Sequence, residues 1–278
     1  MKIKMIGTMM AFLIIGGLGI FSWSRVFGQT GPAGGRCIAM GGVTSVSEEI
    51  WAAANNPALL AGDCLPAISI CLENKYLTGQ MQYNSVAGIL PAGRGGLGFT
   101  GKLLLMSSYC DALMSLGYGR PFGEKVKIGI NLVYHIQSAG EGFDPVHKVS
   151  YGLGTAVDLS AKVSLSFSTF NPFRLYYKSS GYATLPSVFN LGMVYRYAPA
   201  FLVAIELEKE MDFPLCVKTG MEYNFGETVF IRGGIRLLPF GYSFGTAWRK
   251  KRLLIEVSSS YHQYLGFSPV ISFQYNLK

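Results

Sequence analysis

The residues that most often carry catalysis are few in this chain and stand in no catalytic pattern. The three histidines are His135, His147 and His262, and no Gly-x-Ser-x-Gly motif surrounds any serine. A hydrolase would need a serine, a histidine and a carboxylate gathered at one rim of the fold. We therefore expect no enzymatic activity.

The cysteines do not predict a metal site either. Cys37, Cys64, Cys71, Cys110 and Cys216 form neither a Cys-x-x-Cys pair nor another zinc-ligand spacing. We expect no metal and no cofactor. In an exported protein Cys37 and Cys64, which flank one segment, could form a disulfide. The alternative is that all five are small apolar fillers.

The ionisable side chains instead suggest ion pairing, because both signs recur on one face of successive segments. The predicted charge network is Lys102, Lys127, Glu206, Lys218, Glu222, Arg232 and Arg236. Glu206 with Lys218, and Glu222 with Arg232, are plausible cross-strand pairs. His135 on the same face is expected to be a hydrogen-bonding group. A selective pore more often shows one sign of charge, so we expect a salt-bridged, partly plugged interior.

The composition indicates which elements position these charges. Hydrophobic residues make up 50% of the 278 residues and charged residues only 14%, with 35 glycines, whereas soluble domains carry about 25% charged residues. The net charge is +8, but no basic run is interleaved with aromatic residues, so nucleic-acid binding is not expected. Glycine and aromatic residues with little charge are typical of membrane barrels.

Alternation with a period of two supports this interpretation. Val163 to Ser168 alternates without a break, as does Leu215 to Phe225. Fourteen such segments are expected, at 66–76, 80–90, 94–107, 109–119, 125–138, 147–159, 162–170, 187–198, 200–208, 214–225, 228–237, 241–249, 252–261 and 266–277. Most are near the ~9–11 residues of a tilted membrane-spanning strand. The predicted fold is an all-β, antiparallel transmembrane barrel.

The connections differ in length according to whether they follow an even-numbered or an odd-numbered segment. Those after even-numbered segments are short, whereas 138–146 and 171–186 follow odd-numbered ones. Short turns face the periplasm in such barrels and long loops face outward. The basic run Arg249 to Arg252 then falls at a periplasmic turn.

Residues 1–28 are expected to be a signal peptide. Lys2 and Lys4 precede an apolar stretch from Met5 to Phe21, and Val26-Phe27-Gly28 resembles a cleavage site. A retained membrane helix is the alternative. Residues 29–64 do not alternate and predict a compact hatch, with a short helix over Ile50 to Ala54, and residues 65–278 form the barrel. We expect the protein in the outer membrane, surrounded by lipid.

Several motifs carry a resemblance. Arg36, Met40-Gly41-Gly42 and Asn56-Pro57-Ala58 are similar to the N-terminal hatch of FadL-like outer-membrane barrels, and more closely to the PorV/PorQ branch of Bacteroidetes-type bacteria. Further matches are Asn171-Pro172-Phe173, Glu206 to Lys209, Arg232-Gly233-Gly234, Tyr242 to Gly245, and Leu265 to Pro269. The chain departs from that branch in its short outer loops and in ending with Leu277-Lys278.

The resemblance implies two non-catalytic functions. The PorV/PorQ branch implies an accessory of type IX secretion that binds a translocon or exported cargo, with Phe173, Tyr176, Tyr177 and Tyr182 as the contact loop. These aromatic residues could equally anchor strand ends at lipid headgroups. The alternative function is a FadL-like channel for hydrophobic small molecules. Ile50, Trp51, Leu59 and Leu60 would then line an apolar pocket, or else form the core of the hatch.

Overall fold

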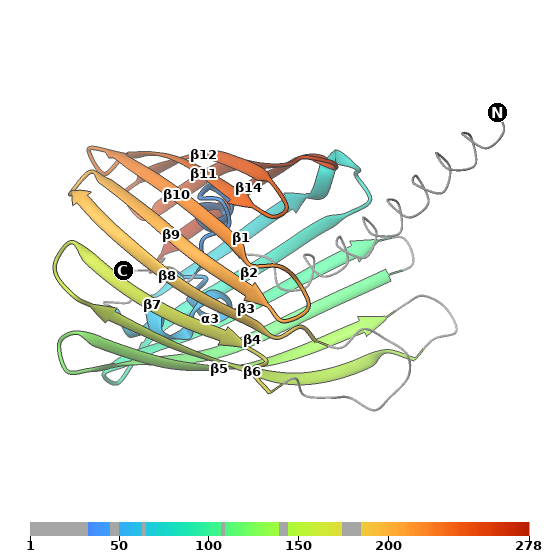
Figure 1. Ribbon diagram of the computed structural model, residues 1–278, viewed down its shortest axis with the longest axis horizontal. Helices are drawn as coiled ribbons and strands as arrows, with labels where there is room; N and C mark the ends of the chain where they lie inside the picture. Colours follow the sequence, from blue (N-terminus) through green and yellow to red (C-terminus); the bar gives the residue numbers. More distant parts are fainter. Residues whose placement is uncertain are drawn as a thin grey trace, which may run out of the picture. The chain divides into compact units, whose positions relative to one another are not determined.

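The computed structural model describes residues 33–44, 50–62, 65–106, 109–138, 144–173 and 185–277. Its main feature is a closed barrel of fourteen antiparallel strands, in which each strand pairs with the next and the first pairs with the last (Figure 1). The predicted fourteen-stranded barrel is confirmed. The segment predicted as a signal peptide lies outside the described residues.

The strands follow the alternating segments of the sequence closely. They are β1 (Ala67–Asn74), β2 (Gln82–Ala92), β3 (Gly95–Met106), β4 (Tyr109–Phe122), β5 (Val126–Ser138), β6 (Val146–Asp158), β7 (Val163–Phe170), β8 (Val188–Ala198), β9 (Phe201–Glu210), β10 (Cys216–Phe225), β11 (Val229–Leu237), β12 (Gly241–Lys250), β13 (Leu253–His262) and β14 (Gly266–Asn276).

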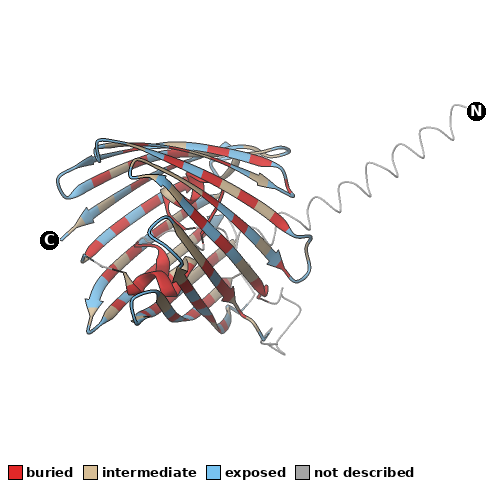
Figure 2. Cartoon of the chain, turned by 60° about the vertical axis from the view of Figure 1, so that its left-hand side comes forward, coloured by how far each residue is buried: buried red, intermediate tan, exposed pale blue. Residues whose placement is uncertain are grey.

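Large apolar side chains cover the outside of the barrel. In β1, Ile68, Ile70 and Leu72 are exposed, whereas Ser69 and Cys71 between them are buried. The same alternation of buried and exposed residues runs along the other strands (Figure 2). Water would not favour so many exposed Leu, Ile and Phe residues. A closed barrel also leaves no unpaired strand edge, as a lipid environment demands.

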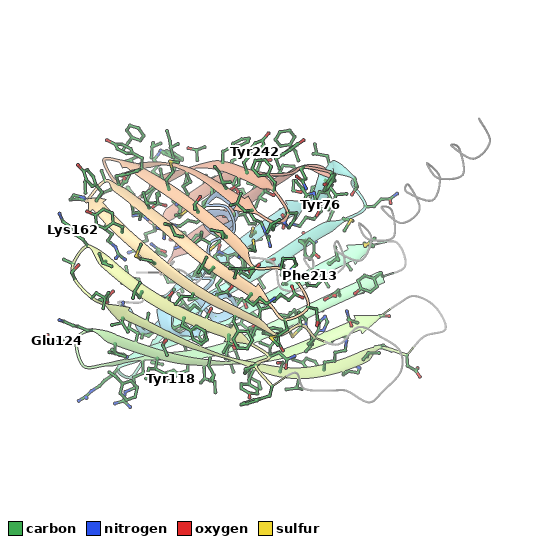
Figure 3. All side chains as sticks on the ribbon, in the orientation of Figure 1. Tyr76, Tyr118, Glu124, Lys162, Phe213 and Tyr242 are labelled. Carbon is green, nitrogen blue, oxygen red and sulfur yellow. The ribbon has the colours of Figure 1, made fainter. Side chains whose placement is uncertain are left out.

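The two ends of the barrel differ in their connections. Turns after even-numbered strands are short, such as Gly93 and Arg94 after β2 and Lys251 and Arg252 after β12. Residues 139–145 and 171–187 connect β5 to β6 and β7 to β8 at the other end. Glu124 and Lys162 mark the short-turn end in Figure 3, and Tyr76 lies toward the opposite one. We take the short-turn end as periplasmic.

Residues 33–44 and 50–62, here called the hatch, contain the helix α2 (Gly35–Ala39), the helix α3 (Ala52–Asn55) and the 3-10 helix η1 (Pro57–Ala61). The helix predicted over Ile50 to Ala54 begins instead at Ala52, because Ile50 and Trp51 form a turn. It ends before Asn56, whose extended backbone suits a residue that precedes proline. A further 3-10 helix, η2 (Lys75–Leu77), follows β1. Among the described residues, no helix is long and apolar enough to cross a membrane.

Candidate functional site: the hatch and the lumen

The second hatch lobe, residues 50–62, packs against a patch of glycines on the inner faces of β3 to β6. Gly119, Gly129 and Gly154 are direct partners across three strands, and Gly98 pairs with Gly117. A Cβ atom added at Gly98 would lie 2.6 Å from the Leu60 side chain. The absence of side chains here lets the hatch approach the backbone of the wall.

The predicted motif Asn56-Pro57-Ala58 shapes this contact. All three residues are buried, and the Asn56 side-chain oxygen accepts a hydrogen bond from the Ala58 N–H at 3.1 Å. This bond caps η1. The side-chain amide of Asn131 on β5 donates to the Ala53 carbonyl oxygen at 2.7 Å. The lobe is therefore held by shape and by neutral hydrogen bonds.

The first hatch lobe, residues 33–44, meets a second glycine patch on β10 to β12. A Cβ atom at Gly220 would lie 2.7 Å from that of Met40. The Ser243 hydroxyl accepts a bond from the Gly41 N–H at 2.7 Å and donates to the Ala39 carbonyl oxygen at 2.8 Å. Gly41 has a φ of 73°, which favours glycine. Thus Met40, Gly41 and Gly42 are fitted to the wall.

Two charged groups fasten this lobe to β9 and β10. The Lys218 ammonium lies 3.0 Å from Glu206 and 2.6 Å from Glu208, and it also donates to the Gly42 carbonyl oxygen at 3.0 Å. Glu206 accepts a hydrogen bond from the Thr44 N–H at 2.8 Å. Lys218 and Glu206 are both almost completely buried.

A second chain of charges holds Arg36. Its guanidinium donates to both oxygens of Glu222, at 2.8 and 2.9 Å. Arg232 pairs with the same carboxylate at 2.6 Å and also with Glu256, which accepts a bond from Ser272. Each buried charge in this chain thus faces an opposite charge, which buried ions require.

The other predicted lumen cations are Lys127, Arg236 and Lys102, and Arg236 joins the first of these two groups through Glu208. Lys127 is 3.4 Å from Asp158, and the Arg236 guanidinium is 3.1 Å from Glu208. The Lys102 ammonium lies 5.0 Å from the centre of the Tyr83 ring. All three point inward from their strands, so the lumen carries charge along most of its length.

A further polar cluster on β4 to β6 contains His135, which was predicted as a lumen hydrogen-bonding group, but the other members Asp111, Gln137 and Lys148 were missed from sequence. His135, completely buried, is 2.7 Å from Asp111, and Gln137 donates to that carboxylate at 3.2 Å. The Lys148 ammonium donates to the Gln137 side-chain oxygen at 2.7 Å. Asp111 stands at an inward position of its alternating segment, and this position could have placed it in the lumen from sequence.

The mouth at the long-loop end holds one more ion pair. The Lys75 ammonium of η2 lies 2.6 Å from Glu73. Burial acts to lower the pKa of Lys75, but the charge of the Glu73 carboxylate outweighs it and raises that pKa. This entrance is therefore polar.

The apolar residues of the hatch are buried. Ile50, Trp51, Leu59 and Leu60 belong to one cluster with the inward side chains of β1 and β2. The wall contributes Ala67, Cys71, Ala87 and Ile89. The seam between the hatch and β1 and β2 is therefore apolar.

The remaining predicted positions lie elsewhere. Phe173 is 77% exposed after β7, whereas Tyr176, Tyr177 and Tyr182 lie outside the described residues. The buried Cys37 thiol accepts a hydrogen bond from the Asn55 side-chain amide at 3.3 Å, and Cys64, the other cysteine of the predicted disulfide, lies outside the described residues. Within the described residues, no group of three His, Cys, Asp or Glu side chains could hold a metal ion.

Comparison with solved structures identifies the architecture. The toluene transporter TbuX of Ralstonia pickettii matches with a TM-score of 0.66 and 12% identity, over 90% of this chain and 99% of its own. A FadL homologue of Pseudomonas aeruginosa matches with a TM-score of 0.63 and 10% identity, over 88% and 97%. The fold is that of FadL-like barrels.

A third solved structure, the monoaromatic hydrocarbon channel CymD, has a TM-score of 0.66 at 12% identity and covers 88% of this chain and 98% of its own. By sequence, no family model and no curated protein matches the chain. The FadL-like fold and the apolar outer surface together place the protein in the bacterial outer membrane.

Proposed function

We propose that the protein is a non-catalytic outer-membrane channel for hydrophobic small molecules. The observation that carries the proposal is the apolar seam between the hatch and β1 and β2, formed by Trp51, Ile50, Ala87 and Ile89 among others. A hydrophobic molecule that enters there exchanges one apolar surrounding for another. At the charged parts of the lumen the same molecule would displace water from ionised side chains, and this desolvation costs free energy.

The fold comparison supports the same proposal. The similar barrels include a toluene transporter and a monoaromatic hydrocarbon channel. This chain shares their architecture at about one-eighth identity or less, so the chemistry of the seam has to supply the argument for a substrate class. We propose apolar compounds of the size of a single aromatic ring.

Passage along this seam requires the second hatch lobe to shift, because Trp51 and Leu60 are buried within it. The lobe can be locked in place. A Cβ atom at Gly117 would lie 3.4 Å from that of Ala53, close to the ~3.5–4.5 Å separation found in disulfides. The double variant Ala53→Cys/Gly117→Cys should therefore cross-link the hatch to β4.

The test is uptake of radiolabelled toluene by intact cells of a bacterial host that lacks such a channel. We expect faster uptake with the protein than without it. In the double variant the disulfide should reduce this increase in toluene uptake at least five-fold, and a reducing agent should restore the uptake. The single variant Gly117→Cys is the matched control. Equal uptake with and without the protein would refute the proposal.

The second candidate function is a PorV/PorQ-like accessory of type IX secretion. The observation that favours it is the polar fastening of the first lobe by Lys218, Glu206 and Glu222, which suits a permanently closed barrel. The exposed Phe173 would belong to its contact loop. Cross-linked affinity purification from the native outer membrane tests this function. Recovery with a large translocon barrel or surface cargo would favour it, and recovery alone would exclude it.

A further inference from the structure

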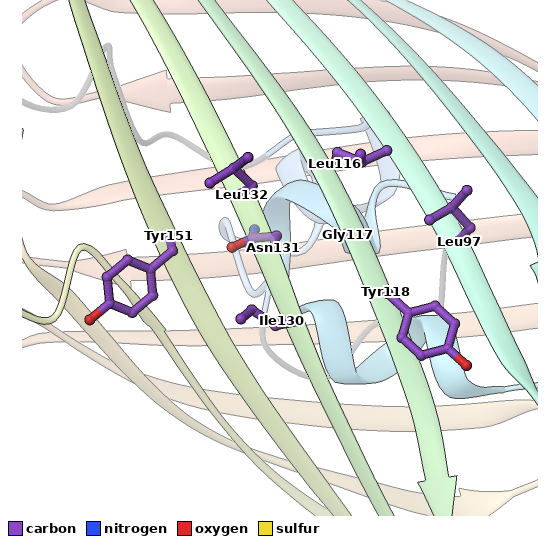
Figure 4. A pocket seen from close by; sticks show the side chains of 8 residues that line it. All are labelled: Leu97, Leu116, Gly117, Tyr118, Ile130, Asn131, Leu132 and Tyr151. Carbon is purple, nitrogen blue, oxygen red and sulfur yellow. The ribbon is translucent and has the colours of Figure 1, made fainter.

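The outer, lipid-facing wall of the barrel contains a depression of about 230 Å³ over β3 to β6 (Figure 4). Its sides are Leu97, Leu116, Ile130 and Leu132, and its floor includes the backbone of Gly117. Pockets that hold a whole small ligand usually measure about 300–1,000 Å³. This depression fits a segment of a flexible chain better than a complete ligand.

A cation follows the depression on the same outward row. Leu116, Tyr118 and Arg120 are successive lipid-facing residues of β4, and all three are exposed. The Arg120 guanidinium lies 5.9 Å from the centre of the Phe122 ring at the short-turn end of β4. Lys125, in the next turn, is also exposed. An apolar slot thus runs into a positively charged rim.

The spacing matches the dimensions of one lipid. Arg120 is four positions after Leu116, which at about 3.3 Å per residue is about 13 Å along the strand. With strands tilted by about 35–45°, this corresponds to about 10 Å of membrane depth. Half of a hydrocarbon core about 30 Å thick is about 15 Å. A phosphate at Arg120 therefore places the distal half of an acyl chain at the depth of the depression.

We propose that the outer wall of β3 to β6 is a binding site for one phospholipid of the periplasmic leaflet. An acyl chain fills the depression between Leu116 and Leu132, and Arg120 with Lys125 binds the phosphate. The aromatic ring of Tyr118 lies between the two parts, at the level where aromatic side chains meet headgroups. This site is separate from the lumen and does not depend on the function proposed above.

Native mass spectrometry of the purified, delipidated barrel titrated with phosphatidylglycerol tests the proposal. We expect one saturable high-affinity site. Arg120→Gln should weaken it at least ten-fold by removing the phosphate partner, and Leu132→Trp should do the same by filling the depression. Inorganic phosphate should not compete, because it has no chain to occupy the slot.

Lys250→Gln is the matched control. Lys250 follows Trp248 on the outward row of β12, with its ammonium 5.6 Å from the indole ring, so it is a cation at a similar depth on another wall. Its removal should leave the site intact. Heat-dependent migration on gels verifies that each variant is a folded barrel. Absence of a saturable site, or equal losses in Arg120→Gln and Lys250→Gln, would overturn the proposal.

Discussion

Lys218 lies directly opposite Glu206 across β9 and β10, and together they hold the two ends of one short stretch of the hatch. The Lys218 ammonium binds the Gly42 carbonyl oxygen, while the Glu206 carboxylate binds the Thr44 N–H. The two charges of the pair neutralise each other. Each also binds the backbone group of opposite polarity, the cation a carbonyl oxygen and the carboxylate an N–H group. A barrel-wall ion pair of this kind fixes both the position and the direction of the first lobe.

Replacement of Lys218 should be strongly destabilising. In Lys218→Met the buried Glu206 carboxylate loses its paired cation, whereas the half-buried Glu208 keeps Arg236. Breaking a buried ion pair such as Lys218–Glu206 costs about 3–5 kcal/mol. The midpoint of urea unfolding in detergent should fall accordingly. Lys209→Met, on the outward face of β9, should change stability by less than about 0.5 kcal/mol. Similar losses in both variants would contradict the assignment.

Two arginines that share Glu222 should differ in importance. Arg36 binds Glu222, whereas Arg232 bridges Glu222 and Glu256. Arg36→Met leaves Glu222 paired with Arg232, but Arg232→Met leaves Glu256 with the Ser272 hydroxyl as its remaining partner among the described residues. We expect the larger loss of unfolding free energy for Arg232→Met, with a coupling of about 0.5–3 kcal/mol in the double variant. The reverse order of losses would show that Arg232 does not bridge the two acids.

A branched side chain at Gly98 should not fit within the glycine patch. Gly98→Val would force a branched side chain against Leu60, and overpacking of this kind costs about 1–3 kcal/mol. Gly88→Ala on β2 is the control, because a Cβ atom there has only the Ala67 carbonyl oxygen nearby, at 3.9 Å. Thermal unfolding should separate the two variants. Equal melting temperatures would mean that the hatch does not press on this wall.

The Asn56 cap should keep the barrel closed. Replacing Asn56 and Pro57 with alanine removes the bond to the Ala58 N–H and the preset backbone of the proline, so the second lobe should loosen. Cells with the double variant should become more sensitive to small antibiotics that the outer membrane normally excludes. Unchanged sensitivity at normal protein levels would show that this motif does not hold a plug.

The strands were predictable because lipid outside and a polar lumen inside impose a strict two-residue period. The segment expected at 125–138 is β5, Val126–Ser138, and the one at 228–237 is β11, Val229–Leu237. Neighbouring strands also made the partners of Lys218 and Arg232 accessible to reasoning, since short turns limit the register.

The contacts of the hatch could not be predicted in the same way. Arg36 and Glu222 are 186 residues apart, and no periodicity relates them. Their meeting depends on where α2 lies inside the closed barrel, which the depth of the glycine patches decides. The outer depression could not be predicted for a similar reason. An alternating pattern specifies which side chains point outward, but not how far apart the outward side chains of neighbouring strands lie.

The pairing of Ile70 on β1 with Phe273 on β14 joins the two ends of the barrel sequence. The hatch precedes β1, yet it lies within the ring that this last seam closes. The hatch therefore reaches its place either before this seam closes or through an open end of the ring, since the hydrogen-bonded wall offers no lateral way in. Either way, the strand that follows the hatch directly in the sequence pairs with the last strand of the chain, so the ring around the hatch is complete only when all fourteen strands are in place.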